Sequence, residues 1–181
     1  MIFTSIFFLF VFFPVTLVLY YLVPWKLKNF ILLLCSLVFY AWGEPVYVFL
    51  MLFSIIFNFI SGIEIQRYQE LEQTKLLRFS FWFTVAVNLG ILGFFKYYGF
   101  LIGNLNAILP FDIPYRDLPL PIGISFYTFQ TLSYIIDVYW GRVPVQKNFI
   151  KFGTYVTMFP QLIAGPIVRY ADVDMQLSKR S

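Results

Sequence analysis

Long apolar runs decide what this chain can fold into. The first, Ile2 to Val23, contains no charged residue. A helix of that length rises about 33 Å, at about 1.5 Å per residue, which is enough to cross the hydrocarbon core of a bilayer. No basic residue precedes the run and no small-residue cleavage site ends it, whereas Lys26 and Lys28 follow it. We therefore expect a membrane span that is retained and not a cleaved signal peptide.

Composition places the whole chain in a lipid environment. Of its 181 residues, 60% are hydrophobic, 23% aromatic and only 12% charged, and the mean hydropathy is +0.78. These values lie outside the globular range. The net charge of +4 is too small and too scattered to indicate a nucleic-acid partner. A single cysteine, Cys35, excludes an internal disulfide, and no metal-ligand spacing is present, so we expect no metal.

The remaining apolar runs predict an all-α, polytopic transmembrane bundle in a single domain. About five spans and a broken or re-entrant sixth segment are expected. After the first run, they cover approximately residues 27–42, 46–63, 79–100, 118–139 and 149–168. The one strongly polar connection, "EIQRYQELEQTKLLR" (64–78), is expected to form an interfacial helix.

The distribution of basic residues predicts an orientation. With the N-terminus outside, the cytoplasmic connections contain eight Lys and Arg residues, against Arg116 and Lys96 on the other side. Cytoplasmic loops carry the excess of Lys and Arg, so this arrangement is favoured. A full sixth crossing would put Arg169 and the two basic residues near the C-terminus outside. A re-entrant segment would keep them inside.

The sixth segment carries "MFPQLIAGPIVRY", in which Pro160, Gly165 and Pro166 break the helical pattern. Irregular backbone is tolerated at membrane depth only inside protein or along a watery cavity. We therefore expect the segment to line a tunnel, with Gln161 and Arg169 facing inward. The alternative is a proline-kinked span in which Arg169 anchors at the headgroups.

A second polar feature lies in the fifth run. At about 100° per residue, one stripe holds Gln130, Ser133, Tyr134 and Asp137. Ionisable residues within a bundle usually face its interior or a water-filled path. The stripe is therefore a candidate tunnel lining, with Asp137 as its most informative member. The alternative is that Asp137 forms a structural ion pair, for which Arg142 is a candidate partner, or is a helix-end carboxylate near the interface.

The strings "LPLPIGISFYTFQTLSYIIDVYWG" and "FGTYVTMFPQLIAGPIVRY" resemble the N-terminal half of the membrane-bound O-acyltransferase family, in the branch that acetylates alginate and related exopolysaccharides. "LVFYAWGEPVYVFLMLFSIIFNF" and "NLGILGFFKYYGF" extend the resemblance to nearly all of residues 1–181. It implies a bacterial inner-membrane enzyme that passes an acyl group from a cytoplasmic donor such as acetyl-CoA, with no bound cofactor, to an exported polysaccharide. A periplasmic or extracellular relay protein is an implied partner.

The resemblance places the catalytic histidine beyond residue 181, and this chain contains no histidine. We therefore expect no catalytic residue within it, and expect a truncated N-terminal part of one acyltransferase domain that is inactive alone. Two other classes stay open. A transporter or flippase subunit would also place polar stripes at depth, and a non-catalytic component of envelope polysaccharide assembly would explain the missing base.

Overall fold

The computed structural model describes residues 5–109, 114, 119–160 and 170–173. These residues form helices and contain no strand, which confirms the predicted all-α class. The elements, in chain order, are η1 (Phe8–Phe12), α1 (Phe13–Leu22), η2 (Trp25–Leu27), α2 (Lys28–Gly43), α3 (Val48–Glu70), α4 (Thr74–Ile108), α5 (Ile124–Tyr139) and α6 (Phe149–Thr157).

Among the described residues, three helices are long and apolar enough to cross a membrane: Trp25–Gly43, Val48–Glu70 and Thr74–Ile108. The chain is therefore an integral membrane protein. The predicted first and fifth spans are shorter helices, Phe8–Leu22 and Ile124–Tyr139. At about 1.5 Å per residue, the nine residues of α6 reach only about 14 Å, roughly half of a bilayer core.

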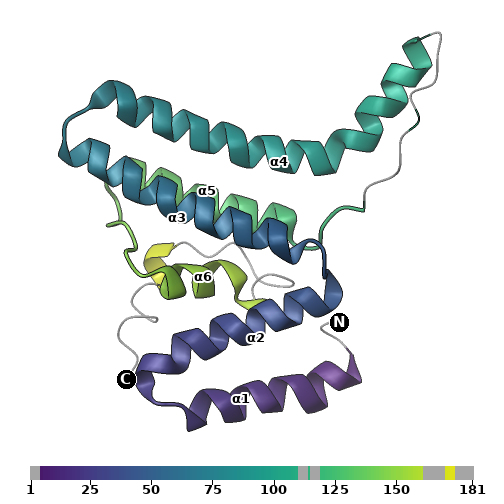
Figure 1. Cartoon of the computed structure of the whole chain (residues 1–181), viewed down its shortest axis with the longest axis vertical. Coiled ribbons are helices and arrows are strands. Elements are labelled where there is room, and N and C mark those ends of the chain that lie inside the picture. Colours follow the sequence, from purple (N-terminus) through teal and green to yellow (C-terminus); the bar gives the residue numbers. More distant parts are fainter. Residues whose placement is uncertain (1–4, 110–113, 115–118, 161–169, 174–181) are drawn as a thin grey trace.

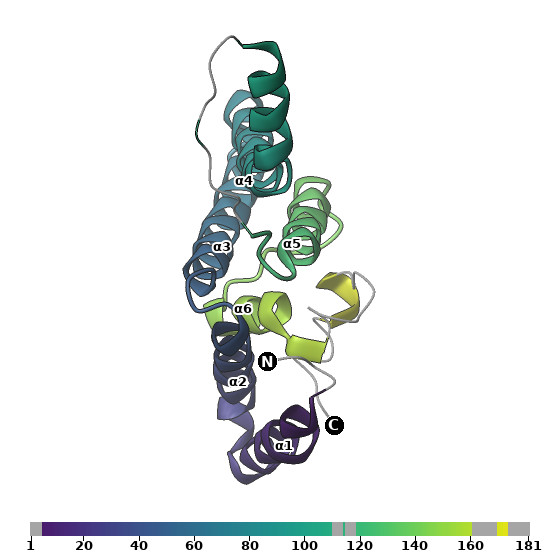
Figure 2. The ribbon, with the colours of Figure 1, turned by 90° about the vertical axis from the view of Figure 1, so that its right-hand side faces the viewer.

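Successive helices run in alternating directions, so the connections collect at two ends of the bundle (Figure 1). The connections α1–α2, α3–α4 and α5–α6 lie at one end, and the α2–α3 connection, the end of α4 and the start of α5 lie at the other. α6 is seated between α2 and the α3–α5 layer (Figures 1 and 2). α2 packs extensively on α6 and only slightly on α3.

Two sequence-based expectations about boundaries are wrong. The fifth helix begins at Ile124 and not near Leu118, because Gly123 adopts a left-handed conformation (φ 77°) that stops the helix from extending upstream. Pro119 and Pro121 therefore precede the helix. The polar connection 64–78 is not a separate interfacial helix. It consists of the end of α3, a short turn, and the start of α4.

A buried amide pair joins α3 to α4. Asn58 Nδ2 donates to Asn88 Oδ1 at 3.0 Å, and Asn88 Nδ2 donates to Asn58 Oδ1 at 2.9 Å. Each amide donates its second proton to a carbonyl one turn earlier on its own helix, at Ser54 and Thr84 respectively. Unpaired polar groups are costly in lipid, so this reciprocal arrangement fixes how the two long helices meet.

Two glycines permit close approach in the centre of the bundle. A Cβ added at Gly62 on α3 would lie 3.1 Å from the Tyr134 hydroxyl oxygen, and one at Gly153 on α6 would lie 3.1 Å from Leu33 Cδ1. Small residues at such crossings are typical of membrane helix packing. Gly62 thus brings α3 against α5, and Gly153 brings α6 against α2.

Candidate functional site

The candidate site lies along α5, which is buried between α3, α4 and α6. The left-handed Gly123 precedes the helix, and Gly141, also at positive φ (65°), follows its end. Between them, ten of the sixteen residues of α5 are buried, and the more exposed side chains, among them Phe126, Phe129 and Ile136, lie along one face of the helix. Of the predicted stripe, Gln130, Tyr134 and Asp137 are buried, whereas Ser133 lies on the more exposed face.

Gln130 links α5 to α6. Its side chain is buried and its amide nitrogen donates to the backbone oxygen of Tyr155 at 2.8 Å. In return, the Tyr155 hydroxyl lies 3.4 Å from the backbone oxygen of Gln130. These contacts tie the two helices together at mid-length.

Ser133 and Tyr134 also bond to backbone groups. Ser133 is half-buried, and its hydroxyl donates to the Gln130 carbonyl at 2.8 Å on its own helix. Tyr134 is fully buried, and its hydroxyl accepts the backbone N–H of Gln146 at 3.0 Å. Its ring packs against Phe152 with 5.0 Å between ring centroids. Tyr134 therefore holds the loop between α5 and α6 against the core.

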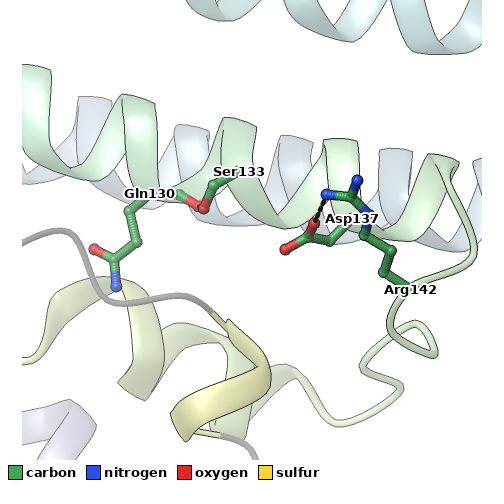
Figure 3. Close-up of polar contacts among 4 residues, drawn as sticks. All are labelled: Gln130, Ser133, Asp137 and Arg142. Atoms are coloured by element: carbon green, nitrogen blue, oxygen red, sulfur yellow. Dashed lines mark hydrogen bonds and ion pairs between the residues drawn. The ribbon is translucent and has the colours of Figure 1, made fainter.

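Asp137 lies near the C-terminal end of α5 and faces Arg142. Figure 3 shows both residues, with Arg142 Nη1 3.5 Å from Asp137 Oδ1. The Arg142 backbone N–H also donates to the Asp137 carbonyl at 2.8 Å. The Asp137 side chain is only 12% exposed, whereas that of Arg142 is 59% exposed and its guanidinium lies 4.3 Å from the Trp140 ring centroid. The ion pair weighed as an alternative is thus present.

The end of α3 supports this part of the site, which sequence reasoning missed. Gln69 Nε2 donates to the carbonyls of Val138 (3.2 Å) and Tyr139 (2.7 Å), which are at the end of α5. Gln66 Oε1 accepts the backbone N–H of Val145 at 2.9 Å. The only sequence signal was two glutamines three residues apart at the polar end of an apolar run. Their partners lie some 70 residues later in the chain.

The remaining predicted site residues fall in the sixth segment. Gln161, Gly165, Pro166 and Arg169 lie outside the described residues. Pro160 is described and exposed, just after α6 ends at Thr157. Whether Gln161 and Arg169 line a tunnel with the α5 stripe therefore stays a prediction.

The chemistry available on α5 is concentrated at Asp137. Gln130, Ser133 and Tyr134 use polar atoms to hold backbone groups, whereas the Asp137 carboxyl group is nearly buried and paired with the exposed Arg142 guanidinium. Figure 3 shows Gln130 and Asp137 projecting from the same side of the helix. No group of three His, Cys, Asp or Glu side chains that could hold a metal occurs within the described ranges.

Comparison with known proteins gives relatives over the full length of the chain. It is 41% identical to the probable alginate O-acetylase of Azotobacter vinelandii, with 100% of this chain and 37% of that protein aligned. Identity to the probable alginate O-acetylase of Pseudomonas aeruginosa is also 41%, with 100% and 35% aligned. The peptidoglycan O-acetyltransferase of Helicobacter pylori is 29% identical, with 100% and 39% aligned.

The chain thus spans little more than a third of the length of these curated relatives. No family model matches it, and no solved structure does. The relatives nevertheless align with every one of its helices and confirm the resemblance drawn from the motifs. Over its whole length, the chain is homologous to the N-terminal portion of alginate O-acetylases of the membrane-bound O-acyltransferase family.

Proposed function

We propose that this chain serves in the O-acetylation of an exported polysaccharide, as the N-terminal part of a membrane-embedded acyltransferase. The observation that carries the proposal is 41% identity over the entire chain to two probable alginate O-acetylases. The acyl donor, an acetyl thioester such as acetyl-CoA, would be used from the cytoplasmic side of the inner membrane. A relay protein on the outer side and a polymer such as alginate would accept the acyl group.

The distribution of charge supports the proposed orientation. The three connections at one end of the bundle carry Lys26 and Lys28, then Arg67, Lys75 and Arg78, then Arg142 and Lys147 (Figure 1). Because cytoplasmic connections carry the basic excess, we place this end in the cytoplasm and the N-terminus outside. An anionic acyl donor would then meet the positively charged end of the bundle first.

A chimeric protein tests the function directly. Residues 1–181 would replace the matching N-terminal portion of the P. aeruginosa relative in a strain that lacks its own copy. Acetyl groups on secreted alginate would then be measured by proton NMR. We expect acetylation to be restored. A chimera that accumulates in the membrane at the normal level and leaves alginate unacetylated would contradict the proposal.

Within that chimera, we propose that Asp137 positions a group in the acyl-transfer path. Asp137→Ala is expected to lower acetylation about tenfold or more, because small losses of positioning are amplified in rate. Arg142→Gln, which removes the ion pair and keeps the carboxylate, is expected to stay within about threefold of the parent, because solvent screens the exposed Arg142 guanidinium. Equal losses in the two variants would make the ion pair a structural anchor only.

A further inference from the structure

An apolar groove lies between α1, α2 and the residues that follow α6. Its volume is about 230 Å³, and its walls include Phe13, Leu17, Tyr20, Leu32, Phe159 and Pro160. Its one buried polar side chain, Thr16, already donates its hydroxyl to the Phe12 carbonyl at 2.8 Å. The groove therefore offers apolar surface with no polar group that calls for a partner.

At the Tyr20 end of this groove lies a cation held among aromatic rings. The Lys28 ammonium is 4.9 Å from the ring centroid of Tyr20, 5.8 Å from that of Tyr21 and 5.3 Å from that of Trp25. Tyr20 belongs both to the groove wall and to this cluster, so the groove leads directly to the cation. Tyr and Trp rings of this kind usually mark the level of the lipid headgroups.

In the part of the chain that the structure describes, this positive charge has no counter-ion. Within the described part of the chain, the one ion pair joins Arg142 to Asp137, so neither Lys28 nor the exposed neighbouring Lys26 is paired with a carboxylate. Ammonium groups at the headgroup level attract anionic lipid. An apolar groove that ends near two lysines matches the shape and charge of one such lipid.

We propose that the groove, Lys26 and Lys28 form a binding site for a membrane lipid with an anionic phosphate headgroup. One acyl chain lies between α1 and α2 against Leu17 and Leu32, and the phosphate contacts the two lysines beside Tyr20. The site is separate from the α5 stripe and does not depend on the proposed acyltransferase function.

The molecule supplies its own control. A second groove of about 170 Å³ on α1 and α2 is lined by apolar side chains that include Val15, Val38 and Trp42, with no basic residue. A lipid chain that enters this groove meets no cation, so it should show no headgroup preference. Trp25 and Trp42 thus report, respectively, on a charged and an uncharged groove.

The test is fluorescence quenching by lipids with brominated acyl chains, in vesicles that contain the 181-residue chain with a single tryptophan. For the Trp25 reporter (Trp42→Phe, Trp82→Phe, Trp140→Phe), we expect brominated phosphatidylglycerol to associate about fivefold more strongly than brominated phosphatidylcholine. The Trp42 reporter should give a ratio near one. Soluble glycerol 3-phosphate should not compete, because it lacks the chain that fills the groove.

Three variants separate the parts of the site. Lys26→Gln with Lys28→Gln should bring the Trp25 ratio to about one, whereas Lys28→Arg should preserve it because the charge remains. Leu17→Phe should lower the Trp25 ratio because the larger side chain narrows the groove. Two results would overturn the proposal. The first is a Trp25 ratio of one in the unsubstituted protein, which would also result if another protein segment filled the groove. The second is a lipid preference that the double lysine substitution leaves unchanged. If Leu17→Phe leaves the Trp25 ratio unchanged, the acyl chain does not lie against Leu17 as proposed.

Discussion

At the scale of single residues, the side chains that hold this molecule together are polar groups placed among apolar ones. Asn58 and Asn88 hydrogen-bond to each other. Gln130 and Tyr134 hydrogen-bond to backbone groups of α6 and of the loop before it. Asn58 and Asn88 each stand in an apolar stretch of sequence, whereas Gln130 and Tyr134 belong to the polar stripe of α5. Their identity as buried groups could be read from the sequence, but their partners could not, because the partners lie between 12 and 30 residues away.

The Asn58–Asn88 pair should contribute measurably to stability. Asn58→Leu or Asn88→Leu leaves one buried amide without its partner, so each is expected to lower the free energy of unfolding by about 1–3 kcal/mol. The double variant should cost less than the sum, because no unpaired amide remains. The double-mutant cycle is measured from the free energies of unfolding in mixed micelles, with circular dichroism as the signal.

Asn104→Leu is the matched control for that cycle. Asn104 is exposed on α4 and donates only to the Phe100 carbonyl of its own helix, so its replacement should change stability by less than about 0.5 kcal/mol. Strict additivity of the Asn58 and Asn88 effects would show that the two amides act independently.

Gly62 and Gly93 give opposite expectations for the same substitution. Gly62→Ala places a Cβ 3.1 Å from the Tyr134 ring and 3.3 Å from Val145 Cγ2, so it should lower stability by about 1–3 kcal/mol through overpacking. Gly93→Ala meets nothing within 4 Å and should raise stability by about 0.5–1 kcal/mol, because it removes helical entropy cost. Both effects are measured by unfolding in mixed micelles. Equal effects of the two substitutions would contradict the close approach of α3 and α5.

At the scale of elements, the sequence predicted the apolar helices well and their ends poorly. Period and length located the helices at 27–42 and 46–63 to within a few residues of α2 and of the start of α3. The end of α3 was missed because its last turns are polar and their stability comes from contacts with α5 and the following loop. The beginning of α5 was missed because one backbone angle, φ of Gly123, overrides the apolar pattern upstream.

Gln69 gives a test of that contact between elements. Gln69→Ala removes the donor to the last carbonyls of α5, so backbone amides near Tyr139 should exchange with deuterium about tenfold faster, corresponding to about 1.4 kcal/mol of local stability. Gln73→Ala, an exposed residue in the adjacent turn, should leave these rates unchanged. Unaltered exchange in Gln69→Ala would show that α5 ends independently of α3.

At the scale of the whole molecule, the alternating helices separate the connections into two sets (Figure 1). In a Cys35→Ala background, cysteines at Lys26, Gln73 and Lys147 should react with an impermeant maleimide only from the cytoplasm. Cysteines at Pro45 and Pro119 should react only from outside. The opposite pattern would reverse the proposed orientation, and a mixture within one set would contradict the arrangement of the helices.

α6 has a consequence for how the protein is made. The α1–α2 hairpin meets the rest of the bundle chiefly through α6, and α2 touches α3 only slightly (Figure 2). Ribosomes deliver α1 to α5 first, so the two groups of helices enter the bilayer before the short element that joins them exists. Their association must wait until residues near Gly153 have emerged and settled against Leu33. We expect the hairpin to remain until then a separate, tethered unit in the lipid, and therefore open to attack by a quality-control protease.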